Sequence, residues 1–389
     1  MRTYEEKKKI LKVGSLFSGV GGIDMGFEQA KSPGAEFRVV WANEFDPHAA
    51  HTYRENHHGH PMLEGDIRSV IRPERSPDPG YYEKLHDIMF AEPVDVLEGG
   101  IPCQAFSVAG LRKGLADERG NMFYAMTDII DIMDEKFGEK PRFVLIENVK
   151  NLKSHDEGRT YGVIKGEFEK RGYTIKDAVL NTMNFTDLPQ NRERIYMLAF
   201  RDAEDAAGFT MFDAPEAFAK KHTAAQWEKI ISDIIDDKED DESLFYTKEK
   251  FPAYFVAEEE FEREWKGRRK YRINLDESVC RKNAFYQLRR GMYVRGNKSG
   301  VCPTLTANMG TGGHNVPIVL TSRGIRKIST KEAFLLQGFP AGHGFALPET
   351  YNGRPFAKSY LYKQAGNAVS VPVLKLIAER LLREVIDPR

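Results

Sequence analysis

The turn GGIPCQAF holds Cys103, one of three cysteines in the 389-residue chain. It follows an apolar run at residues 94–98, and its glycines allow a sharp bend that Pro102 stiffens. A thiolate is a strong nucleophile, but an ordinary thiol has a pKa of about 8.5, so a working site must help to ionise it. We therefore interpret Cys103 as a candidate nucleophile, whereas Cys280 and Cys302 are expected to pack as small apolar side chains.

Glu147 and two arginines are the next candidates for chemistry. Glu147 comes directly after four apolar residues, where a carboxylate is costly to bury without a partner or a purpose. Arg192 and Arg194, which follow Gln190 in the segment LPQNRERIYM, are two residues apart and should lie on one face of a strand. The structural alternatives are a helix-capping acid and a salt-bridged edge strand. An acid, a thiol and a fixed guanidinium in one cleft would suit attack on a polarised heterocycle.

A glycine-rich turn and two later acids indicate a nucleoside ligand. In LFSGVGGIDMGF, the residues Gly19, Gly21 and Gly22 allow a ligand to approach the backbone at the start of a helix. Glu44 follows the next apolar run, where an acid can accept hydrogen bonds from a ribose. Asp66 follows a third short run and could accept from an adenine amine. The alternatives are a plain turn and surface acids, but together these residues favour an adenosyl ligand.

The elements that must position these residues alternate along the first half of the chain. Helical patterns at 22–30, 47–56 and 121–137 lie between short apolar runs that we predict to be strands, at residues 12–17, 37–42, 94–98, 143–148, 173–180 and 194–200. This alternation predicts an α/β fold with a doubly wound, mostly parallel sheet. Ligands of such sheets bind at the carboxyl ends of the strands, where the candidate residues stand.

The character of the sequence changes after residue 201. Residues 263–298 carry twelve lysines and arginines against three acids, a local net charge of +9, with aromatic residues interleaved. An ordinary charged surface is the alternative, but so one-sided a cluster favours a polyanionic partner. An acidic run at 233–242 and a long segment at 69–93 have no role that the sequence indicates. We predict three parts, 1–201, 202–340 and 341–389, the last returning to the first part through a helix at 372–386.

Composition excludes several classes of protein. The net charge of the whole chain is −1, so a nucleic-acid site must be a local patch. Three scattered cysteines suit neither a disulfide framework nor a zinc site, and no metal is expected. We see neither a signal peptide nor an apolar run of transmembrane length, which favours a reduced, intracellular, soluble protein without membrane partners.

Taken in order, the motifs resemble those of the DNA cytosine-5 methyltransferases, in particular the compact bacterial type. The matching segments are FSGVGG, NEFD, GDI, GGIPCQAFS, ERGNMFY, ENV, QNRER, RKISTKEAFLLQGFP and QAGNAVSVPV. The resemblance covers most of the chain outside about 201–300, the variable stretch in which that family recognises its target. It implies a methyltransferase-type sheet at 1–201 for catalysis and cofactor, a smaller irregular target-recognition domain at 202–340, and a DNA cleft between them.

The resemblance also implies roles for individual residues. Cys103 would add to carbon 6 of a flipped cytosine, Glu147 would hold its ring nitrogen 3 and amine, and Arg192 and Arg194 would complete the catalytic set. The residues expected to bind S-adenosyl-L-methionine are Phe17, Gly19, Gly21, Glu44, Asp66, Ile67, Pro102, Met122 and Asn367. Those expected to contact double-stranded DNA are Gln104, Arg268, Arg269, Arg289, Arg290, Arg295 and Lys298.

Two other functions stay open at this point. An RNA methyltransferase acting on transfer RNA is the nearer one, although the large basic variable region favours duplex DNA. A non-catalytic DNA-binding protein of the same fold is the other, and the intact set Cys103, Glu147 and Arg194 argues against it. A nicotinamide oxidoreductase would need a fuller dinucleotide fingerprint. We expect a monomer in the bacterial cytoplasm, associated with the nucleoid through DNA. The sequence leaves open its target site and whether a separately encoded restriction endonuclease accompanies it.

Overall fold

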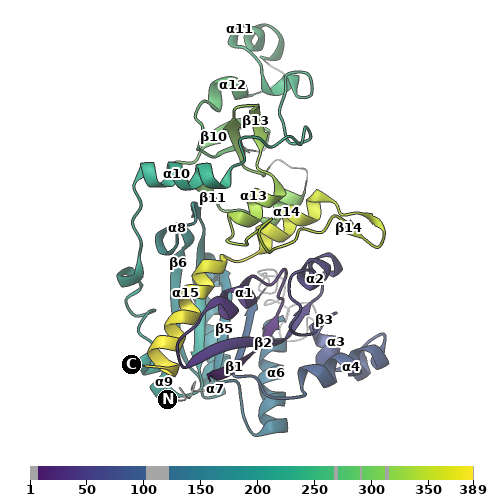
Figure 1. Cartoon of the computed structure of the whole chain (residues 1–389), viewed down its shortest axis with the longest axis vertical. Helices are drawn as coiled ribbons and strands as arrows, with labels where there is room; N and C mark the ends of the chain where they lie inside the picture. The colour runs from purple at the N-terminus through teal and green to yellow at the C-terminus, as the bar shows by residue number, and fades with distance from the viewer. Residues whose placement is uncertain (1–7, 102–121, 267–269, 290, 312–314, 389) are drawn as a thin grey trace, which may run out of the picture. The chain divides into compact units, whose positions relative to one another are not determined.

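The computed structural model describes residues 8–101, 122–266, 270–289, 291–311 and 315–388 (Figure 1). The chain forms two compact units. Unit 1 comprises Met1–Leu180, Glu193–Ala219 and Val369–Arg389, and unit 2 comprises Asn181–Arg192 and Lys220–Ala368. No helix among the described residues is long and apolar enough to cross a membrane.

The two units divide the chain differently from the three predicted parts. Residues 181–192 belong to unit 2 although they lie inside the predicted first part, and unit 2 continues past 340 to Ala368. The cause is a set of buried side chains near Gln190 and Arg192 that hydrogen-bond to backbone carbonyls between residues 305 and 368. Such long-range bonds leave no periodic signal in the sequence, so the boundaries could not be read from it.

Unit 1 is built on the predicted mostly parallel sheet. Its strand order is β3-β2-β1-β4-β5-β8-β6, where the strands are β1 (Lys9–Leu16), β2 (Ala35–Glu44), β3 (Met62–Glu64), β4 (Val96–Gly100), β5 (Phe143–Val149), β6 (Thr174–Asn181) and β8 (Glu193–Phe200). The pairs among β1 to β5 are parallel, and β8 runs antiparallel to β5. Each apolar run predicted as a strand is one, because strands buried on both faces read as continuous apolar segments.

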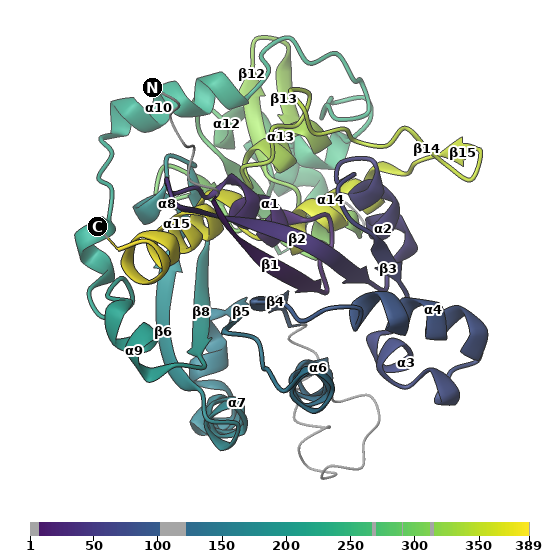
Figure 2. The same ribbon diagram turned by 60° about the horizontal axis from the view of Figure 1, so that its bottom comes forward.

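Helices cover both faces of this sheet. Figure 2 shows α1 (Gly22–Gln29) and α15 (Val371–Leu381) on one face, with α6 (Met122–Phe137) and α7 (Arg159–Lys170) on the other. The last helix belongs to unit 1 and packs on α1, since a Cβ atom at Gly26 of α1 would lie 2.6 Å from Cβ of Leu374 in α15. The other α-helices among the described residues of unit 1 are α2 (Pro47–Arg54), α3 (Ile67–Ile71), α4 (Pro79–Met89) and α9 (Ala203–Gly208).

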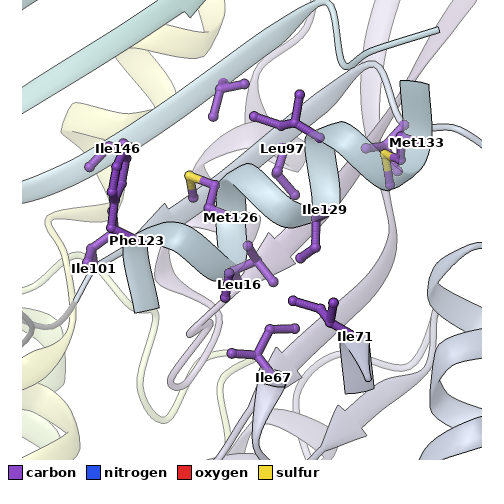
Figure 3. Packing of buried hydrophobic residues seen from close by; sticks show 14 of the residues in the cluster. Leu16, Ile67, Ile71, Leu97, Ile101, Phe123, Met126, Ile129, Met133 and Ile146 are labelled. Carbon is purple, nitrogen blue, oxygen red and sulfur yellow. The ribbon is translucent and has the colours of Figure 1, made fainter. Parts of the chain in front are cut away.

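A hydrophobic core lies between the sheet and α6. Leu97 of β4 points to this side and packs in one cluster with Phe123 and Met126 of α6 (Figure 3). Gly99 faces the same side, where a Cβ atom would lie 3.3 Å from the end of Met126. Because side chains alternate along a strand, Glu98 between them points to the opposite face, beneath α1.

Unit 2 is smaller and less regular. A four-stranded antiparallel sheet has the order β10-β9-β12-β13, formed by β9 (Tyr286–Arg289), β10 (Tyr293–Gly296), β12 (Ile318–Thr321) and β13 (Gly324–Lys327). Its remaining strands are β7 (Gln190–Asn191), β11 (Cys302–Pro303), β14 (Thr350–Tyr351) and β15 (Arg354–Pro355). Its helices are α8 (Thr182–Phe185), α10 (Ala224–Ile234), α11 (Glu258–Glu260), α12 (Leu275–Ser278), α13 (Thr330–Leu335) and α14 (Lys358–Asn367).

The acidic run acquires a structural role in unit 2. Asp237 pairs with Lys282 and accepts from the backbone of Ser322, while Asp241 pairs with Lys358. Further along, Glu242 pairs with Arg323 at 2.8 Å and thereby joins the same network. The run therefore joins segments that are distant in the sequence, although each exposed pair contributes at most about 1 kcal/mol.

Candidate functional site

Glu147 and Arg194 meet at the carboxyl end of the central strands of unit 1. Glu147 lies in β5 beside Gly100 of β4; the residue is 8% exposed, and its Oε1 lies 3.1 Å from Nε of Arg194 in β8. Within the part of the chain that the structure describes, this oxygen accepts no hydrogen bond. A buried carboxylate that is paired in charge but not saturated with hydrogen bonds can bind the edge of a polar ring.

Asn148 holds the backbone that directly follows the neighbouring strand, β4. Its side-chain amide donates a hydrogen bond of 2.8 Å to the carbonyl of Ile101, and its own oxygen accepts from the backbone of Val149. Ile101 is the last described residue before Cys103, so Asn148 positions the start of that turn. The predicted residues Pro102, Cys103 and Gln104 themselves lie outside the described residues.

Arg192 does not share the environment of Arg194. The strand is interrupted at Arg192, between β7 and β8, and the residue belongs to unit 2 with a side chain that is 2% exposed. Its guanidinium donates to the carbonyls of Leu305 at 2.8 Å and Ala368 at 2.6 Å. The predicted common face of the two arginines is therefore wrong, and these contacts favour a structural role for Arg192 over the catalytic one.

Replacing Arg192 with leucine should destabilise unit 2 by about 3 kcal/mol or more, because several buried carbonyls lose their donor. Urea unfolding measures this loss. The matched control is Arg323→Leu, an exposed arginine of the same unit paired with Glu242, which should cost less than about 1 kcal/mol. An Arg192→Leu protein with wild-type stability but without turnover would restore the catalytic assignment.

The glycine turn is shaped to leave its backbone open. Gly19 has a φ of +57°, and a Cβ atom there would meet nothing within 4 Å. Gly21 has a φ of +83° just before α1, which strains any other residue, and a Cβ atom there would lie 2.1 Å from Nε2 of His57, so the His57 ring would have to move. Phe17, with a φ of +54°, packs on the core beside them. The open space at Gly19 fits the approach of a ligand.

Glu44 is oriented by this turn. Its Oε2 accepts a hydrogen bond of 2.8 Å from the backbone of Gly19, and its Oε1 accepts one of 2.7 Å from Asp46. Burial raises the pKa of Glu44, and these two hydrogen bonds oppose the rise. Each oxygen keeps a further lone pair, so the fixed carboxylate can still accept from ribose hydroxyls.

Asp66 lies at the same edge, at the start of α3. It accepts from the backbone of Arg68 at 3.0 Å and pairs with the guanidinium of the same residue. Burial acts to raise the pKa of Asp66, but the bonds from Arg68 outweigh it and the pKa is lowered. Asp66 is therefore an ionised acceptor, suited to an amine.

The remaining residues predicted to bind the cofactor differ in burial and in the unit to which they belong. Ile67 is buried in α3, and Met122 is the half-buried first residue of α6. Asn367 is the exposed last residue of α14 and belongs to unit 2, whereas every other described residue of the predicted cofactor set belongs to unit 1. The place of Asn367 in a cofactor site stays a prediction.

Sequence reasoning missed two aromatic contributions to this edge. Phe45 directly follows Glu44 and is 66% exposed, which is unusual for so large an apolar side chain. The long segment 69–93 folds into α3, a short turn and α4, from which Tyr81 donates to the carbonyl of Glu64 at 2.7 Å and Tyr82 packs against Gly65. The position of Phe45 directly after Glu44, the acid predicted to bind a ribose, could have indicated it. Nothing in the sequence indicated the contacts of α4.

The basic stretch of unit 2 is partly neutralised by acids. Five of its described residues form ion pairs, namely Arg263 with Glu264, Lys266 with Glu262, Arg272 with Glu258 and Glu277, Arg281 with Glu228, and Lys282 with Asp237. No ion pair with another described residue is found for Lys270, Arg289, Arg295 or Lys298. Arg289 and Arg295 come from the β9–β10 hairpin, and Lys298 follows it. Arg268, Arg269 and Arg290 lie outside the described residues.

Comparison with known proteins gives consistent results over almost the whole chain. Residues 11–383 match a family model described as C-5 cytosine-specific DNA methylase. The type II methyltransferase M.Bsp6I of Bacillus sp. (strain RFL6) is 42% identical over 380 residues, which are 97% of this chain and 100% of that protein. The type II methyltransferase M.HhaI of Haemophilus parahaemolyticus is 31% identical over 368 residues, 93% of this chain and 91% of that one.

Solved structures share the fold. The Dnmt2 methyltransferase of S. pombe superimposes with a TM-score of 0.56 at 18% identity, covering 96% of this chain and 98% of that one. The Entamoeba histolytica methyltransferase EhMeth gives a TM-score of 0.57 at 17% identity, with the same coverage of both chains. At these identities the likeness concerns the fold alone.

Proposed function

Because the chain belongs to the C-5 cytosine-specific DNA methylase family and is a DNA cytosine-5 methyltransferase, we propose that it methylates one cytosine of a short duplex sequence within a restriction-modification system. The observation that carries the chemistry is the Glu147–Arg194 pair beside Gly100, at the strand end from which the chain continues to Cys103. We further propose that unit 1 performs catalysis and that unit 2 recognises the target.

The residues at the ends of β1, β2 and β3 fit S-adenosyl-L-methionine. Glu44 would hold the ribose, Asp66 the adenine amine, and Phe45 would lie against the adenine ring, with the open backbone at Gly19 beside the rest of the molecule. When bound, this cofactor supplies the electrophilic methyl group that carbon 5 of cytosine receives.

Cys103 and Glu147 divide the work on the base. The Cys103 thiolate forms a bond to carbon 6, which makes carbon 5 nucleophilic, while Glu147 holds the proton at nitrogen 3 that relieves the developing charge. Loss of the carbon 5 proton then restores the ring as the carbon 6–sulfur bond breaks. Arg194 pairs with Glu147, and we propose that it also contacts the base carbonyl. A stacked base cannot reach these groups, so it must be flipped out of the duplex.

Methylation of genomic DNA by the purified protein, followed by single-base mapping of 5-methylcytosine, tests the proposal. Modification confined to one short motif supports it and supplies the specificity. Absence of DNA methylation while transfer RNA is modified in the same assay would move the function to RNA. The same preparation gives the oligomeric state by light scattering, for which we expect a monomer. Adjacent genes would show whether a cognate endonuclease accompanies it in its bacterial host.

Phe45→Ala should weaken binding of S-adenosylhomocysteine about tenfold, because stacking on an adenine base contributes about 1–3 kcal/mol. Isothermal titration calorimetry measures the affinity. Phe45→Tyr keeps the ring and should stay within about twofold of wild type. Equal affinities for all three proteins would remove Phe45 from the cofactor site.

Replacing Arg289, Arg295 and Lys298 together with glutamine should reduce DNA affinity and flatten its salt dependence, because each phosphate contact adds about 0.9 to the slope of log K against log salt. Electrophoretic binding assays from low to high salt give this slope. The control changes three ion-paired residues, Arg263, Lys266 and Lys282, to glutamine and should change the slope less. A slope unchanged in the first variant would show that these side chains do not touch phosphate.

A further inference from the structure

Two carboxyl groups are buried between the sheet and α1. Asp24 lies on α1, three residues after Gly21, and Glu98 lies in β4, five residues before Cys103. Both are fully buried. Glu98 stands beside Ser15 of β1 in the parallel register, and burial, followed by the nearby charge of Asp24, raises the pKa of Glu98. Asp24 belongs to α1, which covers the face of the sheet opposite α6 (Figure 2), and Glu98 points to that same face because its neighbours Leu97 and Gly99 point toward α6.

These carboxyls are poorly satisfied. Oδ2 of Asp24 and both oxygens of Glu98 accept no hydrogen bond from any residue that the structure describes, and neither acid forms an ion pair there. The other Asp24 oxygen accepts from the hydroxyl of Tyr53 at 3.2 Å. An ionised carboxylate in such a place is very costly, and two side by side repel each other. At least one of them must therefore be neutral in the folded protein.

The titratable groups around the pair add no balancing charge. Tyr53 of α2 reaches Asp24, and His60 is 2.5 Å from the same hydroxyl. Burial, and then the neighbouring His57, lowers the pKa of His60 to about 4, and burial also lowers the pKa of His57. Glu28 on α1 is a further acid, whose pKa burial raises. At neutral pH the surroundings thus offer neutral rings and acids, and a proton is the only available neutralising charge among these described groups.

We propose that Asp24 and Glu98 share one proton: Glu98 is protonated and donates a hydrogen bond to the Asp24 carboxylate. This hydrogen bond would hold the glycine turn that contains Gly19 and Gly21 in position relative to β4, the strand that leads to Cys103. Glu98 is the proton carrier because neither of its oxygens has another donor, whereas Asp24 keeps the Tyr53 hydroxyl. The positioning role rests on the proposed function, whereas the claim that the two acids share a proton does not depend on it.

The proton can be counted without any ligand. An acid that stays protonated in the folded protein releases its proton on unfolding, so its presence makes stability fall as pH rises. The direction follows from burial, which raises the pKa of Glu98 well above its ordinary value. Between pH 6 and 8, each pH unit should raise the unfolding equilibrium constant of the wild type by a factor about ten times larger than the factor for Glu98→Gln, because the wild type releases one more proton on unfolding.

Urea unfolding at several pH values measures this difference in slope. Glu135→Gln is the matched control, because Glu135 is an exposed acid of α6 in the same unit, and it should keep the wild-type slope. A wild-type slope in Glu98→Gln would show that the bound proton does not depend on Glu98 and would overturn the proposal. The comparison uses slopes, so a constant change in stability caused by the substitution does not affect it.

Binding of S-adenosylhomocysteine tests the positioning role. Glu98→Gln can still donate a hydrogen bond to Asp24 and should keep the affinity within about twofold. Glu98→Val suits a strand but cannot donate, and it should lose at least about fivefold. Wild-type affinity in Glu98→Val would reduce the pair to a structural feature and overturn the positioning role. If the wild-type protein itself does not bind S-adenosylhomocysteine, the proposed function is wrong. The shared proton is still tested separately by the pH dependence of urea unfolding.

Discussion

Replacing Cys103 with serine should lower the rate of methyl transfer by at least about four orders of magnitude while leaving DNA and cofactor binding intact. A serine hydroxyl is far less acidic than a thiol and cannot supply the anion that adds to carbon 6. The residues that would bind the cofactor lie at the ends of β1, β2 and β3, and their hydrogen bonds do not involve Cys103, so this variant should keep them. The loss should therefore fall on the chemical step.

Single-turnover transfer of labelled methyl groups to duplex DNA measures that step, and DNA binding is measured on the same preparation. Cys280 is exposed, so the expectation that it packs as a small apolar side chain is wrong, whereas Cys302 is buried. Cys280→Ser therefore makes the same chemical change at an exposed cysteine of unit 2 and should leave the rate unchanged. Residual turnover of Cys103→Ser near that of the wild type would refute the nucleophile. Loss of binding together with turnover would instead indicate that the substitution disturbs the fold.

The sequence predicted the sheet and the acids at its edge because both depend on local pattern. Buried parallel strands read as apolar runs, and the residue that ends such a run lies at the ligand edge, as Glu44 and Glu147 do. The same logic failed for Arg192. Its two-residue spacing from Arg194 is that of one strand face, but the strand is interrupted there and its side chain hydrogen-bonds to residues more than a hundred positions away.

Charge also proved harder to predict than position. The sequence gives the basic stretch a local net charge of +9, yet Glu228 and Asp237, which neutralise Arg281 and Lys282, lie outside it. Likewise, Glu98 reads as the polar end of an apolar strand, and only the packing of α1 shows that it is buried beside Asp24. A count along the chain cannot include partners that the fold brings from elsewhere.

Glu147→Gln should lower the single-turnover rate about a hundred- to ten-thousandfold while cofactor binding survives. Glutamine nearly preserves the shape of the side chain but cannot hold a proton at nitrogen 3 of the base, and it removes the charge that faces Arg194 at 3.1 Å. Glu193→Gln is the matched control, because this exposed acid of β8 pairs only with Lys150 among the described residues. An unchanged single-turnover rate in Glu147→Gln would remove Glu147 from the mechanism.

A double-mutant cycle with Arg194→Met then separates two roles of the arginine. If Arg194 contacts the base carbonyl independently, the two substitutions should act separately, and their effects on the rate should multiply. If it serves only to hold the Glu147 carboxylate in place, the double variant should be no slower than Glu147→Gln alone, since the group it positions is already gone. The ion pair, with an Oε1 that accepts no hydrogen bond from a described residue, leaves room for a substrate donor. We therefore expect partial coupling, with the double variant slower than either single variant but by less than the product of their effects.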